Sequence, residues 1–102
     1  MTEKQTKTVY KVIQLLKKTF PNIRGIRDAS KWGDYTPNMS IHLGDAAEGG
    51  TIGGNKACDY NVIDNEEKVY ILGVHKKLRL VLEDNGFYPE CHDPGTYLAF
   101  RF

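Results

Sequence analysis

Residues 87–102 read FYPECHDPGTYLAFRF, and this stretch decides the fold that we predict for the chain. Its centre, His92-Asp93-Pro94-Gly95, has the composition of a tight turn, because proline fixes φ and glycine tolerates a positive φ. A strand over residues 87–91 and a returning strand over residues 96–102 are therefore predicted to form a C-terminal β-hairpin. Pro89 has no N–H to donate, which favours an edge strand or a bulge for the outgoing strand.

The returning strand presents two different faces. Side chains alternate along a strand, so Leu98, Phe100 and Phe102 share one face, while Tyr97, Ala99 and Arg101 share the other. The first face is entirely apolar. We therefore expect that face to complete the core under the helices.

Residues 4–20 have the apolar spacing of an amphipathic helix. Pro21 ends the predicted helix, because the residue before a proline disfavours helical geometry. The apolar positions fall on one face: Val9, Val12, Ile13, Leu16 and Phe20.

A second helix is predicted over residues 64–85. Asp64 can cap its start, and Glu67 three residues later completes a capping-box pattern. Gly86 suits the left-handed position that follows a helix. An alternative interpretation makes residues 69–72 a strand and begins the helix near Val74, because Val69 and Leu72 lie off the apolar face of the longer helix.

The remaining segments give a strand pair and a long loop. Residues 23–43 contain two apolar stretches joined by a turn-rich connection at residues 31–37. Residues 44–63 are rich in glycine and acids and are predicted to be a loop, with one short strand near residues 57–62. The element order is α-β-β-(loop)-α-β-β. We predict one α+β domain over residues 1–102, with an antiparallel sheet of about four strands and two helices packed on one face.

Composition argues for a soluble, cytoplasmic protein. The chain has 102 residues, 40% of them hydrophobic and 26% charged, with a net charge of +1. No apolar run is long enough to span a membrane, and the N-terminus lacks the apolar core of a secretory signal. Cys58 and Cys91 are the only cysteines, which is typical of a reducing compartment, with a Cys58–Cys91 disulfide as the minor alternative.

Charge is unevenly distributed along the chain. Residues 1–44 carry eight Lys or Arg against three acids, net +5, whereas residues 45–67 carry one Lys against six acids, net −5. A basic first segment therefore leads into an acidic middle segment. The small overall charge gives no bulk electrostatic reason to expect binding to nucleic acid or to a membrane.

Motifs for chemistry are incomplete. The cysteines and histidines lack zinc-site spacing, and the glycines around Lys56 fail the phosphate-loop pattern. We therefore predict no catalytic residue, no metal and no cofactor, and we expect the protein not to be an enzyme. A small metal-dependent enzyme built on Asp45, Asp59 and Glu67 is kept as an alternative, because carboxylates hold Mg²⁺ in nuclease-like sites.

Aromatic and acidic residues in the two connections predict a partner-binding surface. The alternative for Trp32 and Tyr35 is that their rings fold back onto the sheet ends. A nucleic-acid-binding module is a further alternative, because Lys4, Lys7, Lys11 and Lys18 form a basic stripe on the first helix. The predicted partner-binding residues are Trp32, Asp34, Tyr35, Asp45, Glu48, Asp59 and Tyr60.

The segments Gly73-Val74-His75-Lys76-Lys77-Leu78 and Asp93-Pro94-Gly95-Thr96-Tyr97 resemble those of uncharacterised small proteins of phages and mobile elements. The resemblance extends to chain size and to a helix followed by an aromatic C-terminal hairpin. It implies a protein that binds and inhibits a host enzyme or a host defence complex such as CRISPR-Cas. The implied partner is a protein or a ribonucleoprotein, and the resemblance assigns no site residues.

Overall fold

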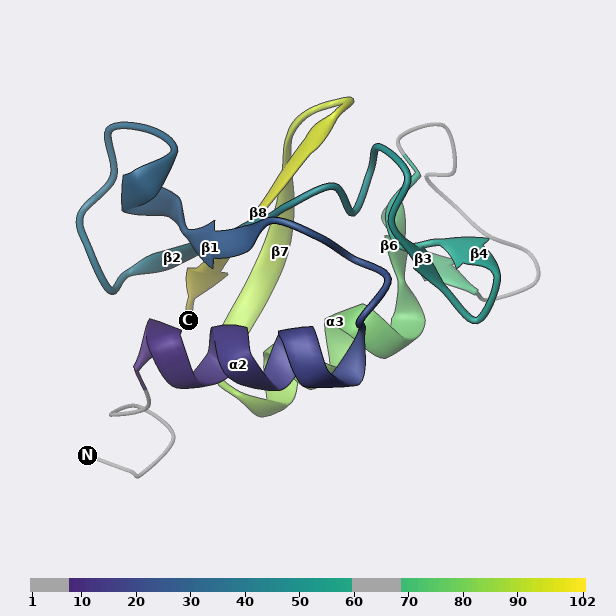
Figure 1. Ribbon diagram of the computed structural model, residues 1–102, viewed down its shortest axis with the longest axis horizontal. Helices are drawn as coiled ribbons and strands as arrows, with labels where there is room; N and C mark the ends of the chain where they lie inside the picture. The colour runs from purple at the N-terminus through teal and green to yellow at the C-terminus, as the bar shows by residue number, and fades with distance from the viewer. Residues whose placement is uncertain (1–7, 60–68) are drawn as a thin grey trace.

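The computed structural model describes residues 8–59 and 69–102, and their arrangement confirms the α+β fold (Figure 1). Four antiparallel strands form the main sheet, in the order β1-β2-β8-β7. The edge position of β7 confirms the role predicted from Pro89. The strand bounds are Ile26–Asp28 for β1, Ser40–Leu43 for β2, Phe87–Asp93 for β7 and Thr96–Arg101 for β8.

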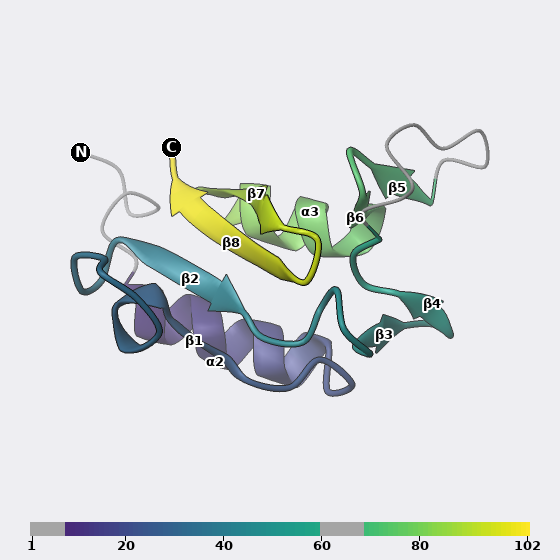
Figure 2. The same ribbon diagram turned by 90° about the horizontal axis from the view of Figure 1, so that it is seen from above.

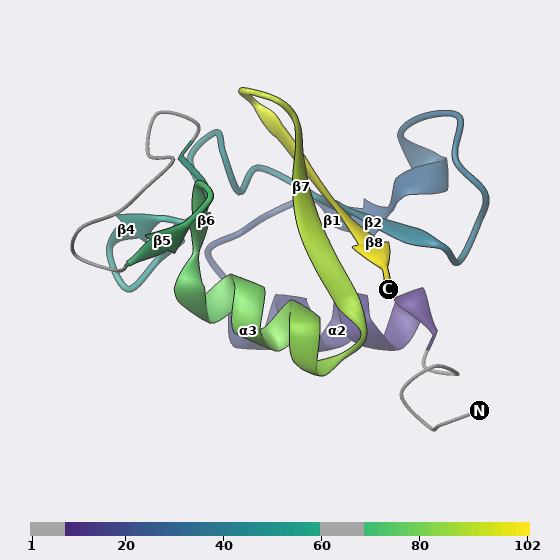
Figure 3. The same ribbon diagram turned by 180° about the vertical axis from the view of Figure 1, so that it is seen from behind.

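The sheet and its helices form two αββ units. Helix α2 (Val9–Thr19) precedes β1 and β2, and helix α3 (Lys76–Asp84) precedes β7 and β8. The second strands of the two units pair at the centre of the sheet, where Ile41 lies opposite Ala99. Both helices therefore cover the same face of the sheet (Figure 3).

Helix α2 matches the sequence prediction over its described length. The Thr8 side chain accepts a hydrogen bond from the Lys11 backbone N–H, which caps the helix start. Phe20 caps the other end, directly before Pro21. Residues 4–7 of the predicted helix lie outside the described residues. The predicted apolar face is buried in the core: Val9, Val12, Ile13, Leu16 and Phe20.

The prediction of one helix over residues 64–85 is wrong. Tyr70–Ile71 and Val74–His75 form strands β5 and β6, and the helix begins only at Lys76. Leu72 and Gly73 both have positive φ, 52° and 81°, which produces the tight turn between these strands. The alternative with the shorter helix is therefore closer to the structure, whereas the proposed cap at Asp64 lies outside the described residues. Gly86 has a φ of 85° and follows the helix as predicted.

The face of β8 that packs on the helices was also predicted wrongly. Tyr97 and Ala99 belong to the core cluster that contains both helices, whereas Phe102 is 78% exposed. Leu98 is buried, but alternation places it with Phe100 on the other face of the sheet. The reason is the register, because small Ala99 faces Ile41 and leaves room for the helices.

Residues 44–59 are more regular than the predicted loop. Thr51–Ile52 and Asn55–Lys56 form a small hairpin, β3 and β4. The segment after β4 joins the β5–β6 hairpin through a bridge between Cys58 and Val74. Of the strand predicted near residues 57–62, residues 60–62 lie outside the described residues. The two small hairpins lie side by side at one end of the molecule (Figure 1). No helix among the described residues is long and apolar enough to cross a membrane.

Candidate functional site

The candidate site is the sheet face that lies away from the helices, here called the open face. Neither α2 nor α3 covers it, although the connection between β1 and β2 packs on part of it where Trp32 contacts His42, and Figure 2 looks down on it. The strand register sets out its side chains in rows across the sheet. One row is Arg27, His42, Leu98 and Glu90, and the next is Ser40, Phe100 and Tyr88.

A chain of aromatic rings crosses the open face. Trp32 stacks on Tyr35 with ring centroids 6.1 Å apart, and Tyr35 contacts Phe100 at 6.3 Å. Tyr88 continues the chain, at 6.1 Å from Phe100 and 5.5 Å from Phe102. Such spacings are typical of favourable ring pairs. The rings therefore form one connected aromatic surface from the connection to the C-terminus.

The connection between β1 and β2 holds Trp32 and Tyr35 in place. It begins with a short 3₁₀ helix, η1 (Ala29–Lys31), whose first N–H groups are capped when Asp28 Oδ1 accepts from the Ser30 N–H at 2.9 Å. The other oxygen of Asp28 accepts from the Asn38 N–H at 2.8 Å, so one carboxylate ties both ends of the connection. Burial by itself would raise the pKa of Asp28, but these backbone hydrogen bonds outweigh it and lower the pKa.

A polar hollow of about 300 Å³ adjoins Trp32. It gathers three of the residues predicted for partner binding, because Asp45 and Glu48 line it together with Trp32. Asp45 Oδ1 accepts from the Arg24 N–H at 2.7 Å, which fixes that carboxylate against the backbone. The Glu48 carboxyl group lies over Gly95, since a Cβ on that glycine would come within 3.0 Å of Glu48 Cδ.

His42 lies between Trp32 and the neighbouring strands. Its ring centroid is 4.9 Å from that of Trp32, and the ring of His92 contacts Trp32 from another side at 5.0 Å. His42 Nδ1 accepts from the Gly44 N–H at 2.9 Å, so a neutral ring carries its proton on Nε2. Burial lowers the pKa of His42, and the positive charge of Arg27 adds to this effect.

The other predicted partner-binding residues are scattered. Asp34 is exposed between Trp32 and Tyr35. Asp59 lies at the β5–β6 hairpin, where its N–H donates to the Gly73 carbonyl at 2.7 Å. Tyr60 lies outside the described residues. Trp32 and Tyr35 fold back onto the sheet, as the alternative prediction held, and Trp32 remains 38% exposed.

The described part of the basic stripe lies on the opposite side of the molecule from the aromatic surface. Lys11 and Lys18 are exposed on α2, which packs on the helix-covered face of the sheet. Lys4 and Lys7 lie outside the described residues. The described lysines and the aromatic rings therefore cannot form one continuous site.

No cluster for a metal ion occurs within residues 8–59 and 69–102, where no three His, Cys, Asp or Glu side chains gather suitably. Glu67 of the metal-dependent alternative lies outside this part of the chain, and Asp45 is held by the Arg24 backbone. Cys58 and Cys91 are both free thiols, the first buried and the second exposed, so the alternative of a disulfide is wrong. Burial raises the pKa of the Cys58 thiol, which keeps it protonated at neutral pH.

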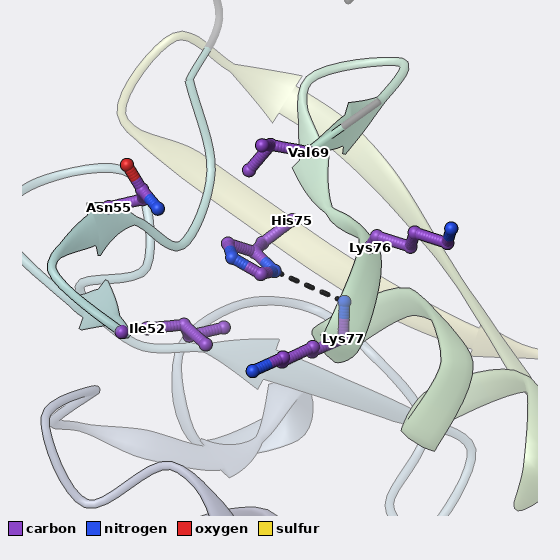
Figure 4. Close-up of a pocket in the computed structure, with 7 residues that line it drawn as sticks. Ile52, Asn55, Val69, His75, Lys76 and Lys77 are labelled. Carbon is purple, nitrogen blue, oxygen red and sulfur yellow. Dashed lines mark hydrogen bonds between the residues drawn. The ribbon is translucent and has the colours of Figure 1, made fainter. Parts of the chain in front are cut away.

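A second hollow, of about 290 Å³, lies between the two small hairpins and the start of α3 (Figure 4). His75 projects into it, and His75 Nδ1 accepts from the Lys77 N–H at 3.1 Å, which caps the helix. Burial lowers the pKa of His75, and the charge of Lys77 lowers it further. The polar edge of this imidazole is therefore used to begin the helix.

Sequence reasoning missed several residues of the open face. Tyr88 was placed only within the outgoing strand, and Phe100 was assigned to the core. His42 was considered only among the histidines that lack zinc-site spacing. The alternation of Ser40 and His42 with Ile41 indicates that this strand has a second face. Which residues lie beside that face depends on the strand order, which the alternation does not give. Comparison with protein-family models, curated proteins and solved structures finds no match to this chain.

Proposed function

We propose that this protein is a non-catalytic binding protein that recognises a macromolecular partner through the open face. The supporting observation is the aromatic chain from Trp32 to Phe102 across a sheet face that neither α2 nor α3 covers. Aromatic side chains supply large contact areas at low entropic cost, which is why they anchor interfaces. Met39 adds to this surface and is 50% exposed.

The polar groups near the rings support binding rather than catalysis. His42 Nδ1, Asp45 Oδ1 and both oxygens of Asp28 accept backbone N–H groups, so they hold the chain's own turns. A general base needs a lone pair directed at its substrate. On this proposal the rings and charges of the open face select the partner. The hydrogen-bonded turns hold these rings and charges in position.

Inhibition or modulation of the partner, and an origin in phages or mobile elements, stay predictions that rest on the resemblance stated above. They are compatible with a small protein that offers one aromatic surface. A protein, or the protein part of a ribonucleoprotein, is the partner class we favour, because an aromatic surface with charges of both signs suits another protein surface.

The proposal is tested by quantitative capture of partners from a lysate of the organism that encodes the chain. We expect the double variant W32A/Y35A to lose a partner that the wild type captures stoichiometrically. The matched control, K11E/K18E, changes exposed side chains on the other side of the sheet and should retain it. Melting curves verify that both variants fold. Retention by the first variant and loss by the second would overturn the proposal in favour of the helix surface.

The nucleic-acid alternative has its own supporting observation. Helix α2 carries Lys11, Lys17 and Lys18 and has no acidic residue between Val9 and Thr19. A phosphate backbone binds such a surface with a steep dependence on salt. If this alternative holds, K11E/K18E abolishes a salt-dependent DNA or RNA shift, while W32A/Y35A leaves the shift unchanged.

A further inference from the structure

The open face carries two hollows, one on each side of the stacked Trp32–Tyr35 pair. The polar hollow of about 300 Å³ is lined by Trp32 and His42, and an aromatic hollow of about 370 Å³ is lined by Tyr35 and Ser40. His42 and Ser40 are two residues apart on β2 and therefore face the same way. The two hollows thus form adjacent parts of one surface.

The polar hollow contains more unused donors than acceptors. Arg27 uses one N–H, donated to the Gly25 carbonyl at 2.8 Å, and the Arg24 side chain makes no hydrogen bond or ion pair within residues 8–59 and 69–102. Of the two acids in the lining, Asp45 is already engaged by a backbone N–H, and the Glu48 carboxyl group lies over Gly95. Arg24 and Arg27 line this hollow together with Trp32, and a guanidinium group can bind a carboxylate in bidentate fashion.

The aromatic hollow suits an apolar side chain. Tyr35, Tyr88 and Phe100 surround it, and the Met39 side chain adds a soft apolar wall. The one cation in its lining, Arg101, donates from Nε and from a terminal nitrogen to the Asn38 carbonyl at 3.2 and 3.1 Å. Its charge is therefore partly satisfied, and the aromatic rings make the hollow suited to an apolar side chain.

The spacing of the two hollows fits an extended chain. The nearest lining residues of the two hollows are Ser40 and His42 along β2, two apart, and Thr96 and Phe100 along β8, four apart. At about 3.3 Å per residue these separations are roughly 7 and 13 Å, so the facing edges of the two hollows lie about 10 Å apart. An extended peptide covers that distance in about three residues.

We infer that the open face binds a linear peptide segment of the partner in which a Glu or Asp precedes or follows a large apolar side chain by three residues. The carboxylate lies between Arg24 and Arg27, and the apolar group enters the aromatic hollow. This inference rests on the proposed function and specifies the partner's chemistry. A nucleic-acid strand is disfavoured, because its repeated phosphates would meet acids outside the polar hollow, namely Asp34, Glu90 and Asp93, whereas a peptide brings a single carboxylate.

Trp32 is the only tryptophan of the chain, so its fluorescence reports binding at the border of the two hollows. The probes are ten-residue peptides, blocked at both ends, with Glu-x-x-Phe, Phe-x-x-Glu, Lys-x-x-Phe or Glu-x-x-Ser at their centre, and a ten-nucleotide oligo-dT. We expect one of the two Glu/Phe peptides to bind at least tenfold more tightly than every other probe. Equal or tighter binding of the Lys peptide or of oligo-dT, or no response to either Glu/Phe peptide at 1 mM, would overturn the inference.

Two charge-removing variants locate the interaction. R24Q/R27Q should weaken binding of the Glu/Phe peptide about tenfold, and K11Q/K18Q, which removes the same charge from α2, should leave it unchanged. Equal weakening by both variants would show a general charge effect and contradict the assignment. Failure of every peptide, with capture of the partner still dependent on Trp32 and Tyr35, would refute the peptide chemistry while leaving the proposed function in place.

Discussion

Val9 donates its backbone N–H to Oδ1 of Asn38, twenty-nine residues later in the chain, at 2.8 Å. The bond joins the first turn of α2 to the connection that carries Trp32 and Tyr35. Asn38 also accepts two hydrogen bonds from Arg101 on its carbonyl oxygen and a third, at 3.4 Å, on Oδ1, and it adopts a φ of 64°. One residue thus links the first helix, the last strand and the aromatic connection, which makes the position of the rings a consequence of the whole fold.

Replacing Asn38 by alanine should therefore destabilise the protein. The variant loses the acceptor for Val9 and places a less tolerant residue at positive φ, which together cost about 2 kcal/mol. Asn38→Asp keeps both properties and should cost far less. Urea unfolding measures the free energies, and a cost for N38A no larger than that for N38D would contradict the role given to this side chain.

Gly44 and Gly53 allow backbone conformation to be separated from steric contact. Their φ values are 61° and 57°, but a Cβ on Gly44 would overlap the Arg24 carbonyl oxygen, whereas a Cβ on Gly53 meets nothing within 4 Å. We expect Gly53→Ala to cost about 1 kcal/mol and Gly44→Ala about 3 kcal/mol or more, or to prevent folding. Equal costs for the two variants in urea unfolding would show that the close approach at Gly44 is relieved by a small backbone shift.

Leu72 should be replaceable with a gain in stability. It has a φ of 52° and is 66% exposed, so its side chain gains little from burial while its backbone is strained. Asparagine tolerates this conformation in tight hairpin turns, and Leu72→Asn should stabilise the protein by about 0.5–1 kcal/mol. Leu80→Asn is a control for removing an exposed leucine, since it lies on α3. A lower unfolding midpoint for L72N than for wild type would argue that the leucine makes a contact of its own.

Stability should fall as the pH drops below about 6.5. The pKa values of His42 and His75 are both lowered from their ordinary value of 6.5 in the folded protein, so the unfolded chain takes up protons first. The stability that the two neutral histidines contribute is fully present above pH 6.5. It decreases as the pH falls, until the pH has passed the pKa values of the folded state. Melting temperatures between pH 7.5 and 5.0 measure the effect, in a range above that in which Asp28 titrates.

His42→Asn supplies the test of this assignment, because an amide oxygen can replace Nδ1 as the acceptor for Gly44 and does not titrate here. The melting temperature of H42N should depend less on pH than that of the wild type. H42N/H75N should be flatter still. A double variant with the wild-type pH dependence would place the effect on other groups.

The sequence by itself determined those elements whose signals are local. The apolar spacing from Val9 to Phe20 and the stop at Pro21 define α2, and Asp93-Pro94-Gly95 defines the final hairpin. Pro89 restricted β7 to an edge or a bulged position, because its missing N–H cannot serve a regular interior strand, and β7 is an edge strand. In each case the physical cause lies within a few residues of its effect.

Only the tertiary structure decided the features that depend on distant partners. Residues 74 and 75 form a strand because Cys58 bridges Val74 and the His75 N–H donates to the Ala57 carbonyl at 2.8 Å, which the local helical pattern cannot reveal. The pairing of Ile41 with Ala99 likewise decided which face of β8 meets the helices. The same pairing turned Phe100 to the open face, where Tyr35 joins it from a connection more than sixty positions earlier. Local propensity limits the secondary structures that a segment can form, but strand register and long-range contacts decide which side chains come into contact. The candidate site is built from such long-range contacts.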